Sequence, residues 1–164
     1  MNVSASSTPF GRVASLHLHP EQPGAGLQAV ESFQVVVGRG VLGDNRYFGR
    51  LSRDSGQPTR RQVTLIEREQ IAEHATALGL ANIPPGAVRA NIETTGLSLI
   101  ALLGREVEIG EARLSFYAPR DPCAKMDAIC QGLRERMLDR RQGVLAQVTQ
   151  SGQIRIGDPI RLVR

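Results

Sequence analysis

Short runs of alternating apolar and polar residues follow one another along the chain and predict a series of β-strands. In segment 14–19, alanine and leucine alternate with serine and histidine, a period of two that is typical of a half-buried strand. His17 and His19 fall on the polar face, so we expect both side chains to face solvent. Similar alternation, or a short apolar run between turn residues, predicts extended segments at 33–37, 62–66, 88–93, 106–109, 113–118, 144–149, 153–156 and 160–163.

Two segments have helical spacing instead. Ile71, Ala75 and Leu78 form an apolar stripe along 67–78, and Gly79 is a typical helix stop. The second stripe has the spacing i, i+3, i+4, i+7 and i+11 and predicts one continuous helix. Its expected buried residues are Met126, Ile129, Cys130, Leu133 and Met137.

Many short strands with turn residues between them, together with two helices, predict a β-rich α+β fold built as a barrel. The segment Gly38–Gly43 spells G-x-G-x-x-G after a strand, but no helical pattern follows it. A dinucleotide-binding loop needs that helix, so we expect these glycines to shape a bulge or a tight loop. The length of 164 residues, with 41% hydrophobic and 22% charged residues, fits one globular domain spanning 1–164.

Neither the first residues of the chain nor its cysteines indicate secretion or a membrane. The first residues have no basic start and no apolar run, and no segment reaches the ~20 apolar residues of a membrane span. On one helix, Cys123 and Cys130 would lie roughly 10 Å apart, too far for a disulfide. The pair alone does not form a zinc site either. We therefore expect a cytoplasmic protein with free thiols, Cys130 serving in the core.

The net charge of +4 is carried by nineteen arginines and a single lysine. Six of these arginines lie in the segment 39–61, which contains only two acidic residues, Asp44 and Asp54. This Gly- and Pro-punctuated segment either meets an anionic ligand or is a solvated loop. Six aromatic residues and no known nucleic-acid motif argue against binding to DNA or RNA.

Cys123 is the strongest candidate for chemistry. The segment Ala-Pro-Arg-Asp-Pro-Cys at 118–123 places it after a strand and at the start of the second predicted helix, close to Arg120 and Lys125. Helix N-termini and neighbouring cations stabilise a thiolate, which favours a nucleophile or a metal ligand. The alternative is a buried cysteine that packs as a small hydrophobic residue.

Several short motifs then follow in a fixed order from about residue 12 to the C-terminus. They are Gly40-Val-Leu-Gly-Asp44, Gln62-Val-Thr-Leu-Ile66, Arg89-Ala-Asn-Ile-Glu-Thr-Thr-Gly96, Leu103-Gly104 to Ile109-Gly110, Arg120-Asp-Pro-Cys123 and Gly152-x-Ile-x-x-Gly-Asp158. In this order and spacing they resemble the MOSC domain, named for the C-terminal part of molybdenum-cofactor sulfurases. The resemblance implies a closed or nearly closed β-barrel of mostly antiparallel strands with a few helices, similar to the pyruvate-kinase barrel.

The same resemblance implies a cofactor and a set of site residues. MOSC proteins bind, or are proposed to bind, the pyranopterin molybdenum cofactor, and Cys123 matches the cysteine that is the family's metal ligand or sulfur-carrying residue. Arg89, Asn91 and Arg120 would bind the phosphate and pterin of this cofactor, although Asn91 could equally be a structural residue. A further expected pair, which would let backbone amides approach the cofactor, is Thr95 and Gly96.

Two functions remain as alternatives. Stand-alone bacterial MOSC proteins are linked to the reductive detoxification of N-hydroxylated bases, so the first is an oxidoreductase on such small molecules, with Cys123 on molybdenum and electrons from a separate redox partner. The second is a sulfur carrier in which a cysteine desulfurase loads Cys123 with a persulfide. A homodimer is one arrangement that the sequence allows.

From its place in the Gly-Asp motif, we expect Asp44 to hold a loop arginine.

Overall fold

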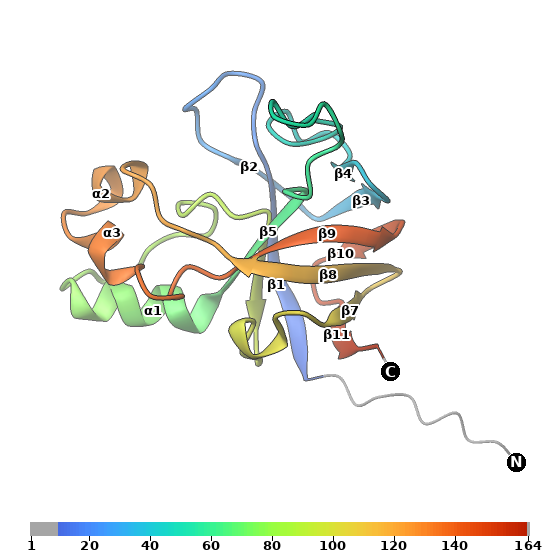
Figure 1. Ribbon diagram of the computed structural model, residues 1–164. Helices are drawn as coiled ribbons and strands as arrows, with labels where there is room; N and C mark the ends of the chain where they lie inside the picture. The colour runs from blue at the N-terminus through green and yellow to red at the C-terminus, as the bar shows by residue number, and fades with distance from the viewer. Residues whose placement is uncertain (1–9, 164) are drawn as a thin grey trace, which may run out of the picture.

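The computed structural model describes residues 10–163, over which the chain forms a β-barrel with short helices at one side (Figure 1). Its strands are β1 (Gly11–Leu18), β2 (Gln28–Val30), β3 (Ser32–Val36), β4 (Gly40–Val41), β5 (Val63–Glu67), β6 (Ile92–Thr95), β7 (Glu106–Ile109), β8 (Ala112–Pro119), β9 (Val144–Gln150), β10 (Gly152–Arg155) and β11 (Pro159–Leu162). Its helices are α1 (Arg68–Ala77), α2 (Lys125–Ile129) and α3 (Leu133–Arg136), with a 3-10 turn at Ile100–Leu102. None of the helices in this part of the chain has the length and apolarity to cross a membrane.

Seven strands close into the barrel. Their order is β11-β7-β8-β9-β5-β6-β1, and β1 pairs back with β11 where Gly11 faces Ile160. Neighbours are antiparallel except for β5 and β6, which are parallel and joined through α1. Closure leaves no open edge in the ring. The predicted β-rich α+β fold with a closed barrel is therefore confirmed.

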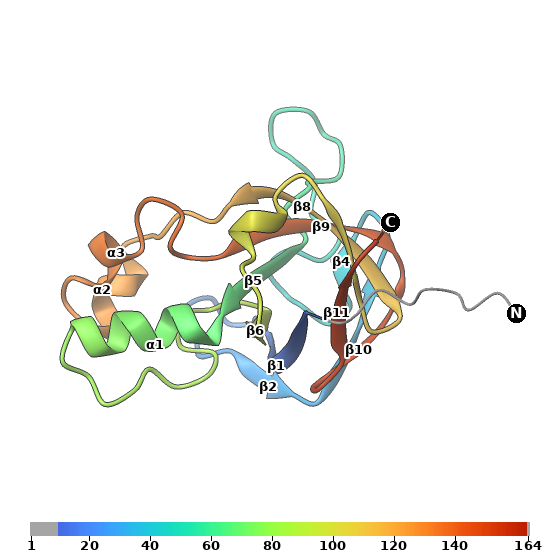
Figure 2. The same cartoon turned by 90° about the horizontal axis from the view of Figure 1, so that it is seen from below.

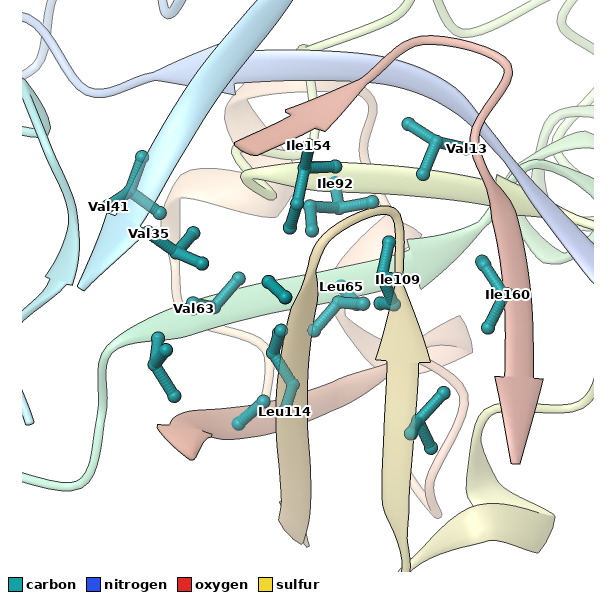
Figure 3. Close-up of a cluster of buried hydrophobic side chains, with 14 of the residues drawn as sticks. Val13, Val35, Val41, Val63, Leu65, Ile92, Ile109, Leu114, Ile154 and Ile160 are labelled. Carbon is teal, nitrogen blue, oxygen red and sulfur yellow. The ribbon is translucent and has the colours of Figure 1, made fainter. Parts of the chain in front are cut away.

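A continuous apolar core fills the barrel (Figure 3). It includes side chains of the ring strands and of the three-stranded sheet β10-β3-β4. The members labelled in the figure are Val13, Val35, Val41, Val63, Leu65, Ile92, Ile109, Leu114, Ile154 and Ile160. A second buried cluster lies under the helices and contains Ile71, Ala75, Met126, Leu133 and Met137.

The prediction of one helix from Met126 to Met137 is wrong. The helix α2 ends at Ile129, Cys130 is extended, and Gly132 has a φ of 94° before α3 begins. A left-handed glycine interrupts a helix, yet the two short helices still direct Met126, Leu133 and Met137 into the core. Cys130, expected in the core, is only half-buried, and both cysteines are free thiols.

The prediction that His17 and His19 face solvent is also wrong, since their exposures are 1% and 5%. Leu16 and Leu18 do point to the barrel core as the alternation requires. The opposite face of β1, however, is covered by other segments: the His17 ring contacts Ala90, and the His19 ring contacts Asp44. The pattern of one strand does not show which distant loop will cover its polar face.

The glycine motif at 38–43 forms a tight turn, as expected. Gly38 and Gly40 have φ angles of 73° and 108° around the hairpin that joins β3 to β4, and no helix follows. At Gly40 a side chain would also meet the backbone of Gln62.

The barrel requires glycine at position 143. Its φ is 78°, and a Cβ there would overlap the carbonyl oxygen of Leu65 on the neighbouring strand. We expect Gly143→Ala to lower the free energy of unfolding by roughly 3 kcal/mol or more in urea titrations. The control is Gly104→Ala, at a similar φ of 80° with open space around it, where only about 1 kcal/mol should be lost. Equal losses in the two variants would contradict this packing.

Candidate active site

A polar cavity of about 200 Å³ opens where three connecting segments meet. The segments are the β4–β5 loop, the 84–91 segment before β6, and residues 120–124 between β8 and α2. We call it the Cys123 cavity, and the residues that line it are His19, Arg46, Tyr47, Arg61, Thr64, Arg89, Arg120, Asp121, Cys123, Lys125, Met126 and Gln142. Five of these residues are cationic and one is an acid, so the cavity suits an anionic ligand.

Cys123 places an exposed, free thiol at this cavity. Its exposure excludes the alternative of a buried hydrophobic cysteine. The helix that follows has only five residues and begins two positions later, so it supplies less of a helix dipole than a long helix would. Among the residues that share the cavity with the thiol are the cations Arg120 and Lys125.

Arg120 lies buried beneath the cavity, with 7% of its surface exposed. Its Nη2 donates to the carbonyl oxygens of Val88 at 2.9 Å and Arg89 at 3.3 Å, whereas its Nη1 has no partner. Burial, and secondarily the nearby charge of Arg61, lowers the pKa of Arg120 to about 10, so the guanidinium stays charged at neutral pH. A buried N–H without a partner is costly, and an acceptor on a ligand would satisfy it.

Arg89 is held in an unusual backbone conformation, with a φ of 65°. The bond from Arg120 to its carbonyl oxygen stabilises this geometry, and its own Nη1 donates to Ala25 at 3.0 Å. Non-glycine residues in this region cost free energy and are concentrated at functional sites. Arg89 and Arg120 were both predicted as ligand-binding residues, and the structure brings them together with Cys123.

Two further lining residues have buried polar atoms without partners, namely Nε of Arg61 and Oε1 of Gln142. Together with Arg120 they offer two donors and one acceptor to whatever fills the cavity. Sequence analysis missed both as site residues. Arg61 was one of six arginines in the loop, and Gln142 carried no signal of its own.

Asn91 has a structural position. It is fully buried, and its side-chain oxygen accepts from the backbone N–H and the hydroxyl of Thr64. Its side-chain nitrogen donates to the carbonyl oxygen of His17 at 3.1 Å and to Asp44 at 2.9 Å. With these bonds made, Asn91 supports the site from below and does not line the cavity.

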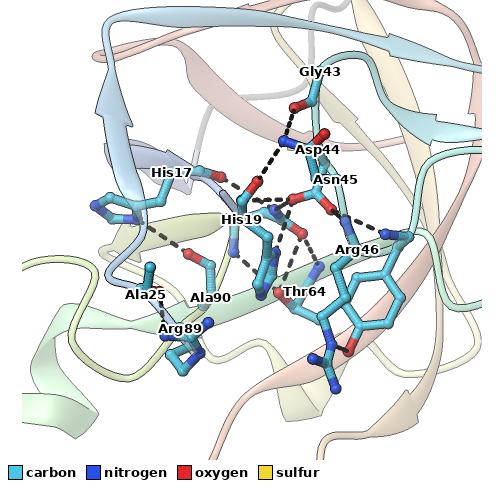
Figure 4. A network of polar contacts seen from close by, with 12 residues as sticks. His17, His19, Ala25, Gly43, Asp44, Asn45, Arg46, Thr64, Arg89 and Ala90 are labelled. Carbon is cyan, nitrogen blue, oxygen red and sulfur yellow. Dashed lines mark hydrogen bonds and ion pairs between the residues drawn. The ribbon is translucent and has the colours of Figure 1, made fainter. Parts of the chain in front are cut away.

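Asp44 is the centre of the polar network beside the cavity (Figure 4). Its carboxylate accepts from the backbone N–H groups of His19, Arg46 and Tyr47, from the His19 ring and from Asn91. Burial by itself raises the pKa of Asp44, but the bonds from His19 and Tyr47 outweigh it and lower the pKa to about 2. Asp44 thus organises the turn through backbone groups and a histidine, not through an arginine side chain as expected.

His19 is a site residue that sequence analysis missed. Because ionised Asp44 can only accept, the Nδ1 of His19 carries the proton in their 2.8 Å bond. The ring also packs edge-on against Tyr47, with 5.5 Å between centroids. This leaves Nε2 as the nitrogen available to a ligand in the cavity that His19 lines.

Thr95 and Gly96 are not brought to the cavity. They lie at the opposite end of β6 from Asn91, where Thr95 faces Arg12 of β1 and the N–H of Gly96 donates to Glu69. Both residues are exposed. Their closeness to Asn91 in sequence therefore does not place them near Cys123.

Two more hollows adjoin the Cys123 cavity. One of about 280 Å³ shares His19, Arg46 and Arg89 with it, and another of about 240 Å³ shares Arg46, Tyr47 and Arg61. Cofactor sites commonly need ~300–1,000 Å³, so a cofactor would extend from the Cys123 cavity into a neighbouring hollow. Among residues 10–163, no three His, Cys, Asp or Glu side chains gather as a metal site. A metal at Cys123 would need other ligands, such as those of an organic cofactor.

A closed mixed barrel whose exposed thiol shares a cavity with buried Arg120 and other cations defines a β-barrel protein with a cysteine-containing anion site. The family model of the MOSC domain matches residues 34–161, and the chain belongs to the MOSC domain family. No curated protein matches the chain.

Solved structures share the fold at low sequence identity. The YuaD protein from Bacillus subtilis has a TM-score of 0.77 and 19% identity, covering 95% of this chain and 97% of its own. YiiM from Geobacillus stearothermophilus has a TM-score of 0.71 and 19% identity, covering 94% and 75%. YiiM from Escherichia coli has a TM-score of 0.66 and 19% identity, covering 93% and 70%. At this identity the likeness shows the fold alone.

The Asp44 network should contribute measurably to stability. A carboxyl whose folded pKa of about 2 lies below the unfolded value stabilises the fold above the unfolded pKa, and this contribution is lost as pH falls towards 2. We expect Asp44→Asn to lower the free energy of unfolding by about 2 kcal/mol at pH 7, with the difference narrowing between pH 5 and 2.

The measurement is urea unfolding across this pH range. Asp54→Asn, at an exposed carboxylate in the same loop, should change stability by less than about 0.5 kcal/mol. A difference between wild type and Asp44→Asn that does not vary with pH would contradict the assigned charge state of Asp44.

Proposed function

We propose that this chain binds the molybdenum cofactor in the Cys123 cavity, with the Cys123 sulfur as a metal ligand. We further propose that it acts in the cytoplasm as an oxidoreductase that reduces N-hydroxylated small molecules. One observation supports this above the others: an exposed thiol shares a cavity with the buried guanidinium group of Arg120, whose Nη1 has no partner, and with half-buried Arg61, whose Nε has none.

The residues of the cavity fit this cofactor. Molybdenum accepts soft thiolate ligands, so one protein sulfur can complete a shell that the dithiolene of the pterin begins. The unpartnered N–H groups of Arg120 and Arg61 suit the oxygens of the cofactor phosphate. The unpartnered Oε1 of Gln142 suits an N–H of the pterin ring.

When bound, the cofactor would supply the abstraction of oxygen from the N–OH group of the substrate. The chain's own residues orient the ligands and handle protons. Conversion of N–OH to N–H releases water and consumes protons, and His19, held by Asp44, can carry a proton at Nε2. Arg89 and Arg120 fix the anionic end of the cofactor. Electrons would come from a separate redox partner.

A second candidate function is a sulfur carrier. The exposure of Cys123 favours it, because a cysteine desulfurase must reach the thiol to leave a persulfide on it. In this case the surrounding cations would stabilise the persulfide anion.

The molybdenum content of purified protein separates these proposals. In a host that makes the cofactor, we expect wild-type protein to hold molybdenum and Cys123→Ala to lose at least about 90% of it, since the metal loses its protein ligand. Cys130→Ala is the matched control, because this second free cysteine does not line the cavity, and it should retain the metal.

Molybdenum that persists in Cys123→Ala would contradict the assigned ligand. Protein without molybdenum that gains about 32 Da at Cys123 after incubation with a cysteine desulfurase would establish the sulfur carrier instead.

A further inference from the structure

The hollow of about 240 Å³ beside the Cys123 cavity is lined mainly by arginines of the β4–β5 loop. We call it the arginine cavity, and its charged residues are Arg46, Arg50, Arg53 and Arg61. No carboxylate lines it, although an acid, Asp54, follows Arg53 directly in sequence. Of these four residues, only Arg61 has a role in the proposed binding of the cofactor.

These arginines have no acidic partners. None of the ion pairs formed among residues 10–163 involves any of the four. Gathering like charges around one hollow without a counter-charge is unfavourable, and an anion bound there would relieve the repulsion. Arg53 lines this hollow and neither of the other two, so its guanidinium group is a donor that the cofactor does not use.

The backbone that carries the arginines is ordered by its own hydrogen bonds. Thr59 donates to the carbonyl oxygen of Arg50 at 3.0 Å, Ser52 donates to Gln57 at 2.8 Å, and Leu51 pairs with Pro58 as an isolated bridge. This loop projects from the barrel between β4 and β5 (Figure 2). The guanidinium groups therefore start from a fixed backbone, which lowers the entropic cost of binding.

The arginine cavity and the Cys123 cavity share one wall. Arg46, Tyr47 and Arg61 line both hollows. The guanidinium carbon of Arg46 lies 5.4 Å from the centre of the Tyr47 ring and that of Arg61 lies 5.2 Å from it, while Nε of Arg46 donates to the tyrosine hydroxyl at 2.9 Å. One ligand could thus place a reactive group near Cys123 and an anionic group among the arginines.

We infer that the arginine cavity binds a phosphate monoester group of the substrate. Several guanidinium groups around one hollow match the three terminal oxygens and the double charge of a phosphate. A carboxylate, in contrast, needs only one guanidinium group with its pair of parallel N–H donors. This inference rests on the proposed reductase function and narrows its substrates to N-hydroxylated compounds that carry a phosphate. The cofactor then occupies the Cys123 cavity and extends into the other neighbouring hollow, which shares His19, Arg46 and Arg89 with it.

Phosphorus-31 NMR titration of the full chain with inorganic phosphate tests the subsite without any turnover. Because the cations of the Cys123 cavity can bind phosphate too, the readout is the phosphate site that depends on Arg53. Arg53→Gln removes one exposed guanidinium group and should weaken binding at this site at least about tenfold. Arg105→Gln is the matched control, since this exposed arginine lines none of the cavities described, and it should leave binding unchanged. Binding that Arg53→Gln leaves intact would overturn the inference.

The same titration on molybdenum-loaded protein identifies the source of the phosphate. A substrate subsite should still bind phosphate after loading, and Arg53→Gln should keep its molybdenum. Loss of phosphate binding on loading would assign the arginine cavity to the cofactor and overturn the substrate subsite. Tighter binding of an oligonucleotide than of phosphate, with a steep salt dependence, would overturn it in favour of a nucleic-acid surface.

The two proposals can fail separately. If the protein never holds molybdenum but binds phosphate through Arg53, the proposed anion site is supported and the proposed reductase function is rejected. If the protein holds molybdenum through Cys123 but the Arg53→Gln variant binds phosphate as well as wild type, cofactor binding is supported and the phosphate subsite is rejected.

Discussion

The buried carboxylate of Asp44 is the constraint on which the site depends. It ties the end of β1, the turn after β4 and the start of β6 together through His19, Tyr47 and Asn91. Asn91 extends the same network to Thr64 on β5. A buried charge is tolerated only when it is fully bonded, and this one is. Because Asp44 fixes the turn, it also fixes where the polar groups of the cavity wall stand.

Around this anchor the protein accumulates features that cost stability. Arg120 is charged and buried with one N–H unsatisfied, Arg89 has a positive φ, and Arg61 and Gln142 each have an unpartnered buried atom. A well-packed core under the barrel and helices offsets such costs. A ligand that satisfies these groups would bind the folded state and stabilise it further.

The barrel could be predicted because most of its strands carry a period-two pattern or a short apolar run between turn residues, and Cys123 because its motif is local in sequence. Arg89, from the segment at 89–96, and Arg120, from the motif of Cys123, line the same cavity as Cys123. What could not be predicted depends on contacts between distant segments. His19 looked like a solvent-facing strand residue because nothing in β1 shows that Asp44 will cover it. Thr95 and Gly96 were expected at the cavity because they are close to Asn91 in sequence. The extended strand β6 separates them from Asn91, so they lie at its other end.

The central claim is that the Cys123 sulfur binds molybdenum within the arginine-lined cavity. X-ray absorption spectroscopy at the molybdenum edge tests it most directly, because it counts the sulfur atoms bound to the metal. We expect one sulfur more than the dithiolene supplies in wild-type protein, and the loss of that one sulfur in any metal retained by Cys123→Ser. Identical sulfur shells in the two proteins would contradict it.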